Sequence, residues 1–256
     1  MKLQDFYDST AHIYDLHYGV EESSANKKFY GELAEKYGAP ILEPACGTGK
    51  LAIWLATQGY EVVGVDISHR MLEVAKVEKL PEEVADRISF VQADFSDLSL
   101  DKQFRLVIIP NNSFVLAESE VTQLNALRCF GRHLQSNGVL ALDFRFLTGG
   151  NERFGAPFFD DLMVDPETNH TYTHMITRNF DPETNLLHFV HVIHEYDQSN
   201  NVKGWLSQNT MRCLTVDEFQ EMLRQSGFQL IAEYGGIDKS SFSKDSGRIV
   251  AIAEKS

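Results

Sequence analysis

The sequence has few cysteines, a shortage of basic residues and no long apolar run. Its three cysteines, Cys46, Cys129 and Cys213, are too far apart and odd in number for a disulfide framework, which favours a reducing compartment. Lysine and arginine number 23 against 37 acidic residues, and the net charge of −14 disfavours a nucleic-acid partner. No run of about 18 apolar residues could span a membrane, so we expect a cytoplasmic protein with no membrane partner.

What the sequence does contain is an alternation of short apolar runs with helical patterns. Strands are expected at 40–46, 61–66, 87–92, 104–110, 139–146, 228–234 and 248–254. Helices are expected at 50–58, 121–135 and 216–225, and in a further segment that carries Met71, Leu72 and Ala75. Ser68 and Thr215 are each suited to cap the start of a helix. The alternation predicts an α/β fold with a Rossmann-like, seven-stranded, mostly parallel sheet, flanking helices and an antiparallel pair of strands at its edge.

The N-terminal segment precedes this alternation. Apolar residues recur at helical spacing over residues 3–37, and Gly38 and Pro40 then supply a stop. We expect residues 1–38 to form an N-terminal helical cap.

A second segment interrupts the alternation between residues 151 and 213. The sequence Asp-Pro-Glu-Thr-Asn occurs at 165–169 and again at 181–185, each time between runs rich in Thr, Tyr, His, Phe and Val. These two copies, and a third turn at 198–204, are typical of hairpins. The prediction is a single domain over 1–256 with an antiparallel β insertion at 151–213, placed over the active site.

The sequence Glu43-Pro44-Ala45-Cys46-Gly47-Thr48-Gly49 lies between the first predicted strand and its helix. Glycines allow a sharp turn and close approach to a ligand, and a helix N-terminus offers free N–H groups. Asp66 follows at the end of the second strand, where a carboxylate can accept both hydroxyls of a ribose. Gly47, Gly49 and Ala52 also match the dinucleotide fingerprint, so a nicotinamide cofactor and a turn without any ligand stay open.

Three features favour S-adenosylmethionine (SAM) over a nicotinamide dinucleotide. Glu43 precedes the loop, where a carboxylate suits an ammonium group better than a pyrophosphate. The third strand ends in Gln92-Ala93-Asp94-Phe95, which places a second carboxylate where an adenine amino group could donate to it. No tyrosine is followed by a lysine four residues later, so the usual base pair of the short-chain dehydrogenases is absent.

With these motifs together, the chain resembles the class I SAM-dependent methyltransferases, small-molecule branch. The stretches that carry the resemblance are 43–49, 63–72, 92–95 and 134–143, within a match from Tyr7 to the last strand. The sequence is similar to the group that contains the amino-sugar N-methyltransferases of macrolide pathways. One departure is Ala45, which replaces the usual first glycine of the loop, and we expect the loop to tolerate its methyl group.

The resemblance implies a set of cofactor-binding residues. Around the methionine part of SAM it places Glu43, Ala45, Gly47, Gly49, Pro110 and Asn111. Around the ribose and adenine it places Asp66, Ile67, Met71, Asp94 and Phe95.

Residues that contact the methyl acceptor are expected in two places. Tyr7, Tyr14 and Tyr18 lie in the N-terminal segment, which covers the SAM site in the resembling family; they could equally be packing residues of a cap. Asn112, Ser113 and Phe114 follow the fourth strand, where they could line the acceptor pocket. Arg145 lies near the end of the fifth strand, where it could bind an acidic group or pair with an acid of the protein. No catalytic residue is assigned, because methyl transfer requires a general base only if the nucleophile arrives protonated.

Five of the nine histidines lie between residues 170 and 194, and His188, His191 and His194 are regularly spaced. On a strand, His191 points to the face opposite the other two, and those two lie about 20 Å apart. We therefore predict no metal site from this string.

Methyl transfer from SAM to nitrogen or oxygen of a small molecule is the predicted function. An amine is the preferred acceptor, because an acidic protein attracts cations. The alternatives are a nicotinamide-dependent oxidoreductase and a SAM-binding protein without catalysis. Whether the chain forms a homodimer is left open.

Overall fold

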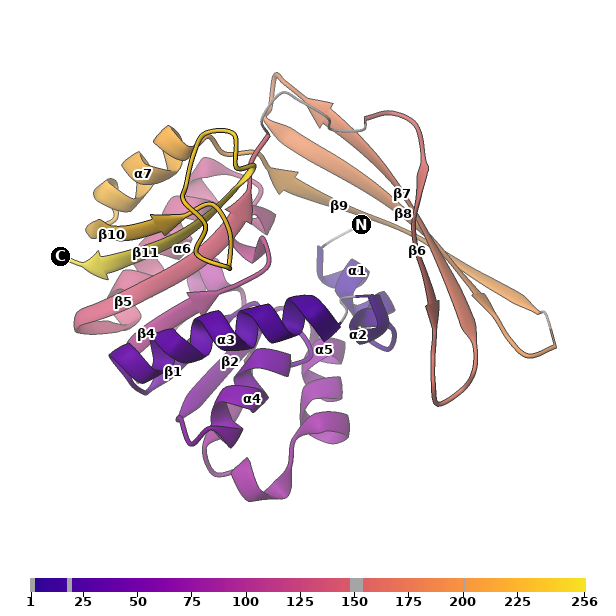
Figure 1. Cartoon of the computed structure of the whole chain (residues 1–256), viewed down its shortest axis with the longest axis horizontal. Helices are drawn as coiled ribbons and strands as arrows, with labels where there is room; N and C mark the ends of the chain where they lie inside the picture. Colours follow the sequence, from indigo (N-terminus) through magenta and orange to yellow (C-terminus); the bar gives the residue numbers. More distant parts are fainter. Residues whose placement is uncertain (1–2, 18–19, 148–153, 200) are drawn as a thin grey trace.

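The computed structural model describes residues 3–17, 20–147, 154–199 and 201–256 (Figure 1). Its core is a seven-stranded sheet with the strand order β10-β11-β5-β4-β1-β2-β3. The strands are β1 (Ile41–Pro44), β2 (Val62–Asp66), β3 (Ile88–Gln92), β4 (Phe104–Ile109), β5 (Leu134–Arg145), β10 (Phe228–Tyr234) and β11 (Arg248–Lys255). Strand β11 pairs antiparallel with β10 and β5, and the other neighbours are parallel. The predicted Rossmann-like fold is confirmed.

Helices cover both faces of this sheet. On one face lie α3 (Val20–Tyr37), α4 (Lys50–Thr57) and α5 (His69–Glu73), and on the other lie α6 (Glu120–His133) and α7 (Val216–Gln225) (Figure 1). Phe29 and Leu55 are buried in the first layer, and Phe130 and Phe219 in the second. Short helical turns complete the connections: η1 (Val74–Lys79), η2 (Glu82–Val84), η3 (Phe95–Asp97) and η4 (Ser113–Leu116).

Local side-chain hydrogen bonds start two of these helices where the sequence predicts. The Ser68 hydroxyl accepts the N–H of Met71 at the start of α5. Thr215 and Glu218 form a reciprocal capping box at the start of α7. Gly38, with φ of +81°, follows the last residue of α3 as a left-handed stop.

Two predicted boundaries are wrong. The helix expected to reach residue 135 ends at His133, and β5 begins at once because Leu134 is buried and pairs with Phe104. The turn expected over 198–204 ends earlier, since the Asp197 carboxylate accepts the N–H groups of Ser199 and Asn201. Gly204 therefore lies inside a strand.

The insertion forms a separate four-stranded antiparallel sheet, in the order β6-β7-β8-β9. Its strands are β6 (Phe158–Val164), β7 (Thr171–Asp181), β8 (Leu186–Tyr196) and β9 (Val202–Arg212). Asn169 and Asn185, the last residues of the two repeated motifs, have φ of 56° and 57° and close the predicted hairpin turns. Figure 1 shows this sheet projecting beyond the edge of the core.

The first two helices, α1 (Leu3–Thr10) and α2 (Tyr14–His17), lie between the insertion and the core (Figure 1). Helix α3 instead packs on the core sheet through Phe29 and Tyr30. The segment expected as one cap is thus divided, and only α1 and α2 cover the sheet edge. Among the helices of the described residues, none is long and apolar enough to cross a membrane.

Candidate functional site

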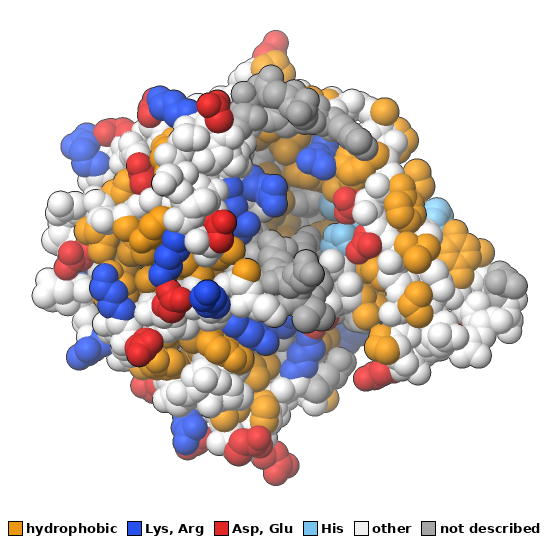
Figure 2. Space-filling view, viewed as in Figure 1, with side chains coloured by type: hydrophobic (Ala, Val, Ile, Leu, Met, Phe, Trp, Pro, Cys, Tyr) orange, Lys and Arg blue, Asp and Glu red, His pale blue; other side chains and the backbone are white. Residues whose placement is uncertain are grey.

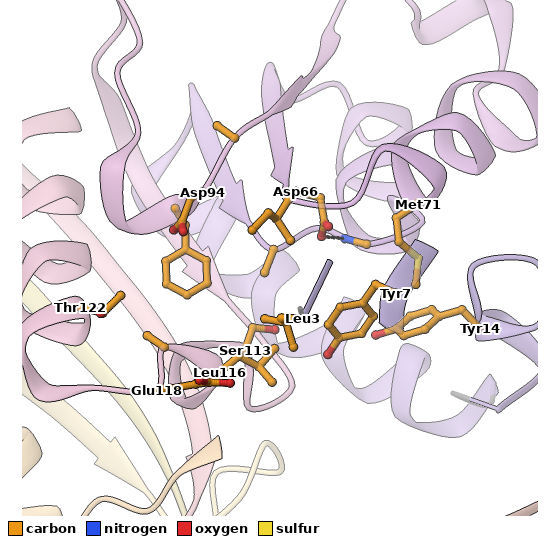
Figure 3. Close-up of a pocket in the computed structure, with 16 residues that line it drawn as sticks. Leu3, Tyr7, Tyr14, Asp66, Met71, Asp94, Ser113, Leu116, Glu118 and Thr122 are labelled. Carbon is orange, nitrogen blue, oxygen red and sulfur yellow. Dashed lines mark hydrogen bonds between the residues drawn. The ribbon is translucent and has the colours of Figure 1, made fainter. Parts of the chain in front are cut away.

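A cavity of about 510 Å³ lies at the carboxyl ends of the central strands (Figure 3). It adjoins the point where the strand order reverses between β1 and β4, where open α/β sheets bind ligands. Figure 3 shows Asp66 and Asp94 on one side of the cavity and Tyr7 on the other. A smaller cavity, of about 70 Å³, shares Tyr14 and Ser113 with it.

The two cavities bring together most of the predicted cofactor residues. The large one is lined by Ala45, Gly47, Asp66, Ile67, Met71, Asp94 and Phe95. The small one is lined by Glu43, Ala45, Pro110 and Asn111. Gly49 lines neither; a Cβ there would lie 2.9 Å from the Phe90 ring, so this glycine permits close packing of the loop on the sheet.

The loop between β1 and α4 turns on three residues with positive φ. These are Ala45 at 56°, Gly47 at 55° and Gly49 at 73°. The left-handed conformation costs an L-residue about 1–2 kcal/mol, and Ala45 carries this cost. The loop therefore tolerates the methyl group of Ala45, but in a conformation that favours glycine.

Asp66 ends β2 with its carboxylate inside the site. One oxygen accepts the N–H of Gly47 at 2.8 Å, and the other accepts the N–H of Ser68 at 2.9 Å. Burial raises the pKa of Asp66 above its usual value, against the lowering effect of these two hydrogen bonds. The residue thus fixes the glycine loop and, as part of the cavity lining, retains a second lone pair on each oxygen.

Asp94 follows β3 and starts the turn η3. One carboxylate oxygen accepts the N–H of Ser96 at 2.8 Å and its hydroxyl at 2.7 Å. The side chain is exposed at the rim of the large cavity, next to Phe95. These two hydrogen bonds hold the carboxylate at the cavity rim.

Glu43 is 2% exposed at the end of β1, and its Oε2 has no hydrogen-bond partner among the described residues. Burial raises the pKa of Glu43 to about 8, with a smaller contribution from the charge of Asp66 and an opposing hydrogen bond from Ala52. A buried acceptor without a partner is costly. A cationic group in the small cavity would satisfy it and restore the ionised form.

Glu43→Gln is expected to stabilise the ligand-free protein at alkaline pH and to lower its affinity for a cationic group in the small cavity. Between about pH 4.5 and 8 the folded protein retains a proton on Glu43 that the unfolded chain has lost, so wild-type stability falls as pH rises through this window. At pH 8.5 the variant should be more stable by at least about 1.4 kcal/mol, the equivalent of one pKa unit. Urea unfolding at pH 5 and pH 8.5 measures this, and a variant that loses stability at both pH values would contradict it.

The loop after β4 is held by Asp143 of β5, which the sequence did not mark as a site residue. Asp143 Oδ1 accepts the N–H of Asn111 and the hydroxyl of Tyr30, each at 3.0 Å. Its Oδ2 accepts from the Arg248 guanidinium at 3.0 and 2.6 Å. The Asn26 amide donates to the Asn111 side chain at 2.8 Å, so α3 helps to place this loop.

The α1–α2 segment covers the cavity with aromatic rings. Tyr7 and Tyr14 both line it, with their ring centroids 6.2 Å apart. Asp15 attaches the segment to the glycine loop, since it accepts the Thr48 hydroxyl at 2.7 Å and lies 3.3 Å from the Lys50 ammonium. The third predicted tyrosine, Tyr18, lies outside the described residues.

Two of the other predicted acceptor residues line neither cavity. The Asn112 side chain accepts the backbone N–H of Arg145 at 2.6 Å, so it connects the loop to β5. The Arg145 side chain is exposed. Of the predicted residues after β4, Ser113 lines the large cavity. The end of η4, the connection after it and the start of α6 add Leu116, Glu118 and Thr122, which were not predicted. A serine N-cap at Ser119 is the local signal that could have located this segment.

Comparison with known proteins gives consistent matches. A family model described as a methyltransferase domain matches residues 41–138. The YqeM protein of Bacillus subtilis (strain 168), named as a candidate methyltransferase, is 28% identical over 98% of this chain and 97% of its own length. Among solved structures, the CcbJ methyltransferase of Streptomyces caelestis has a TM-score of 0.82 at 18% identity, with both chains covered completely. SAM-bound CalS10 of Micromonospora echinaspora, an amino pentose methyltransferase, has a TM-score of 0.70 at 17% identity, covering 100% of this chain and 98% of its own.

Proposed function

Because the chain belongs to the class I SAM-dependent methyltransferases, we propose that it methylates a nitrogen or an oxygen of a small molecule, with an amine as the preferred acceptor. SAM, when bound, would supply a methyl group on its sulfonium sulfur. The lone pair of the acceptor would form a bond to that carbon as the carbon–sulfur bond breaks, S-adenosylhomocysteine would leave, and the proton of the acceptor would pass to solvent. The residues of this chain then have to bind SAM, align the acceptor and exclude water.

The cofactor-binding roles are part of the proposal. Glu43, buried and with an unpartnered oxygen, would accept the ammonium group of SAM in the small cavity. Asp66 would accept the two ribose hydroxyls, and Asp94 the adenine amino group. Gly47 would let the backbone approach the ligand closely, since it lines the cavity and lacks a side chain.

The observation that carries the choice of acceptor is the composition of the large cavity. Besides Asp66 and Asp94, which would bind the cofactor, its lining includes the carboxylate of Glu118, and no lysine or arginine among the described residues. Together with a net charge of −14, this favours a cationic or neutral acceptor over a polyanion. The cover formed by Tyr7 and Tyr14 restricts the space to a small molecule. The fold shared with CalS10, which is described as an amino pentose methyltransferase, supports the same class of acceptor.

Two measurements test this proposal. Calorimetric titration should detect binding of SAM and S-adenosylhomocysteine but not of NAD. SAM with a labelled methyl group is then offered with separate pools of small amines, small alcohols and bulk RNA. We expect label in the amine pool, with one S-adenosylhomocysteine formed for each methyl transferred. Binding of NAD alone, or label confined to RNA, would overturn the proposal.

A further inference from the structure

Three side chains with metal-ligating atoms meet where the α1–α2 segment contacts the insertion. His17 ends α2, Asp160 lies in β6 and His174 lies in β7. One ligand atom from each lies within 4.8 Å of the other two. Asp160 Oδ2 is 3.1 Å from His174 Nδ1 and 3.7 Å from His17 Nε2. Figure 2 shows histidine and acidic side chains together in the hollow between the core and the insertion.

A chain of hydrogen bonds behind this cluster fixes the tautomer of His174. His191 Nε2 lies 2.8 Å from Asn209 Oδ1, an acceptor only, so this nitrogen carries the proton. In the neutral ring, a proton on Nε2 leaves Nδ1 of His191 with a lone pair. That lone pair accepts from His174 Nε2, at 2.9 Å.

Because His174 Nε2 donates to His191, the other ring nitrogen, Nδ1, carries a lone pair. In the neutral ring, Nδ1 carries no proton once Nε2 is the donor. The side chain is 3% exposed, and Nδ1 has no hydrogen-bond partner among the described residues. Yet it lies 3.1 Å from a carboxylate oxygen of Asp160, which is also an acceptor. Two acceptors at this distance need a shared proton or a metal ion between them.

We propose that His17, Asp160 and His174 bind one divalent transition-metal ion, of the Zn²⁺ type. Two imidazole nitrogens and one carboxylate oxygen are a donor set that such ions prefer. Around a tetrahedral ion, donor atoms lie about 3.3 Å apart, so small side-chain rotations suffice to close the site. His191 and Asn209 then act as supporting partners, because they hold the His174 ring in the tautomer that ligates.

The position of the site indicates what the ion does. It joins α2 to strands β6 and β7, and so ties the α1–α2 segment to the insertion. Tyr14, the first residue of α2, lines the large cavity and also a third cavity of about 30 Å³ beside His17 and His174. The ion therefore stabilises the cover of the SAM site and takes no part in the methyl transfer.

The test is Zn²⁺ binding by the full-length protein after dialysis against a chelator, measured by competition with a chromogenic chelator. We expect one equivalent, with a Kd of about 1 μM or tighter. His174→Gln and Asp160→Asn should weaken it at least about a hundredfold, and His191→Gln about 10- to 100-fold. His188→Gln is the matched control, since this exposed histidine of β8 lies outside the cluster.

Thermal unfolding separates loss of the site from loss of the fold. Zn²⁺ should raise the Tm of the wild type and of His188→Gln, but not of His174→Gln, which must still melt cooperatively. Absence of Zn²⁺ binding by the wild type overturns the proposal. So does an equal loss in the His188 control. A His174 imidazolium that titrates against Asp160 with no metal bound would show that a proton supplies the positive charge instead.

Discussion

Asp66→Asn is expected to weaken the binding of SAM and S-adenosylhomocysteine by about ten- to a hundredfold, because a charged acceptor for two hydroxyls contributes about 1.5–3 kcal/mol. A second cost arises inside the protein. Both oxygens of Asp66 already accept backbone N–H groups, from Gly47 and Ser68, and the amide nitrogen of asparagine cannot replace either. The glycine loop should therefore be less well fixed in the variant. Calorimetric titration of both ligands measures the loss.

A double-mutant cycle distinguishes direct ribose contact from loop disorder. One change in the cycle is Asp66→Asn, and the other is made in the ligand, by use of S-adenosylhomocysteine that lacks its ribose hydroxyls. If Asp66 binds those hydroxyls, the variant should lose much less affinity for the deoxy ligand than for S-adenosylhomocysteine, and the loss that remains measures the loosened loop. Asp97→Asn, at an exposed position beyond β3, serves as the control and should bind normally. Equal losses for both ligands would assign Asp66 to loop support alone.

The stability of the folded protein should change little in Asp66→Asn. Burial raises the pKa of Asp66, so its ionised carboxylate is disfavoured in the free protein and removal of the charge offsets the lost hydrogen bonds. We expect the unfolding free energy to change by less than about 1 kcal/mol. Affinity and stability thus separate at this residue.

The parts of this molecule that sequence predicts well depend on near neighbours in the chain. The capping box at Thr215 needs only Glu218, three residues on, and each Asp-Pro-Glu-Thr-Asn turn needs only its own five residues. The residues predicted to bind the cofactor also come from local signals, since most lie at or just after the carboxyl end of a strand and parallel strands bring those ends to one edge; their roles stay a prediction. These features were recognisable before the topology was known.

The features that the sequence did not predict depend on contacts between residues that are far apart in the sequence. Arg248 reaches Asp143 only because β11 lies next to β5, and the two residues are 105 positions apart. His17 and His174 come together only because α2 packs against the insertion. His191 pairs with His174 on the neighbouring strand, a contact that the spacing of His188, His191 and His194 along their own strand does not reveal. No local pattern specifies such contacts.

Asp143→Ala is expected to destabilise the protein by about 3–5 kcal/mol, the usual cost of removing one partner of a buried ion pair. Asp143 is fully buried, and its carboxylate accepts from Tyr30, Asn111 and Arg248. The Arg248 guanidinium, with a side chain only 15% exposed, would lose this carboxylate. Urea unfolding should show a lower midpoint with an unchanged slope. Asp101→Ala, at an exposed position before β4, is the control and should change stability by less than about 1 kcal/mol.

The same substitution should also affect the ligand, because Asp143 fixes the backbone of Asn111 beside the small cavity. Stability and affinity can be separated with the double variant Asp143→Leu/Arg248→Met, which replaces the ion pair by apolar groups. Such replacements are often neutral or stabilising, but the Tyr30 hydroxyl and the Asn111 N–H still lose their acceptor, so only part of the lost stability should return. SAM affinity should not return, since leucine cannot accept the N–H of Asn111. Recovery of both would mean that the ion pair is purely structural. Recovery of stability alone would identify Asp143 as the residue that positions the loop after β4 for the cofactor.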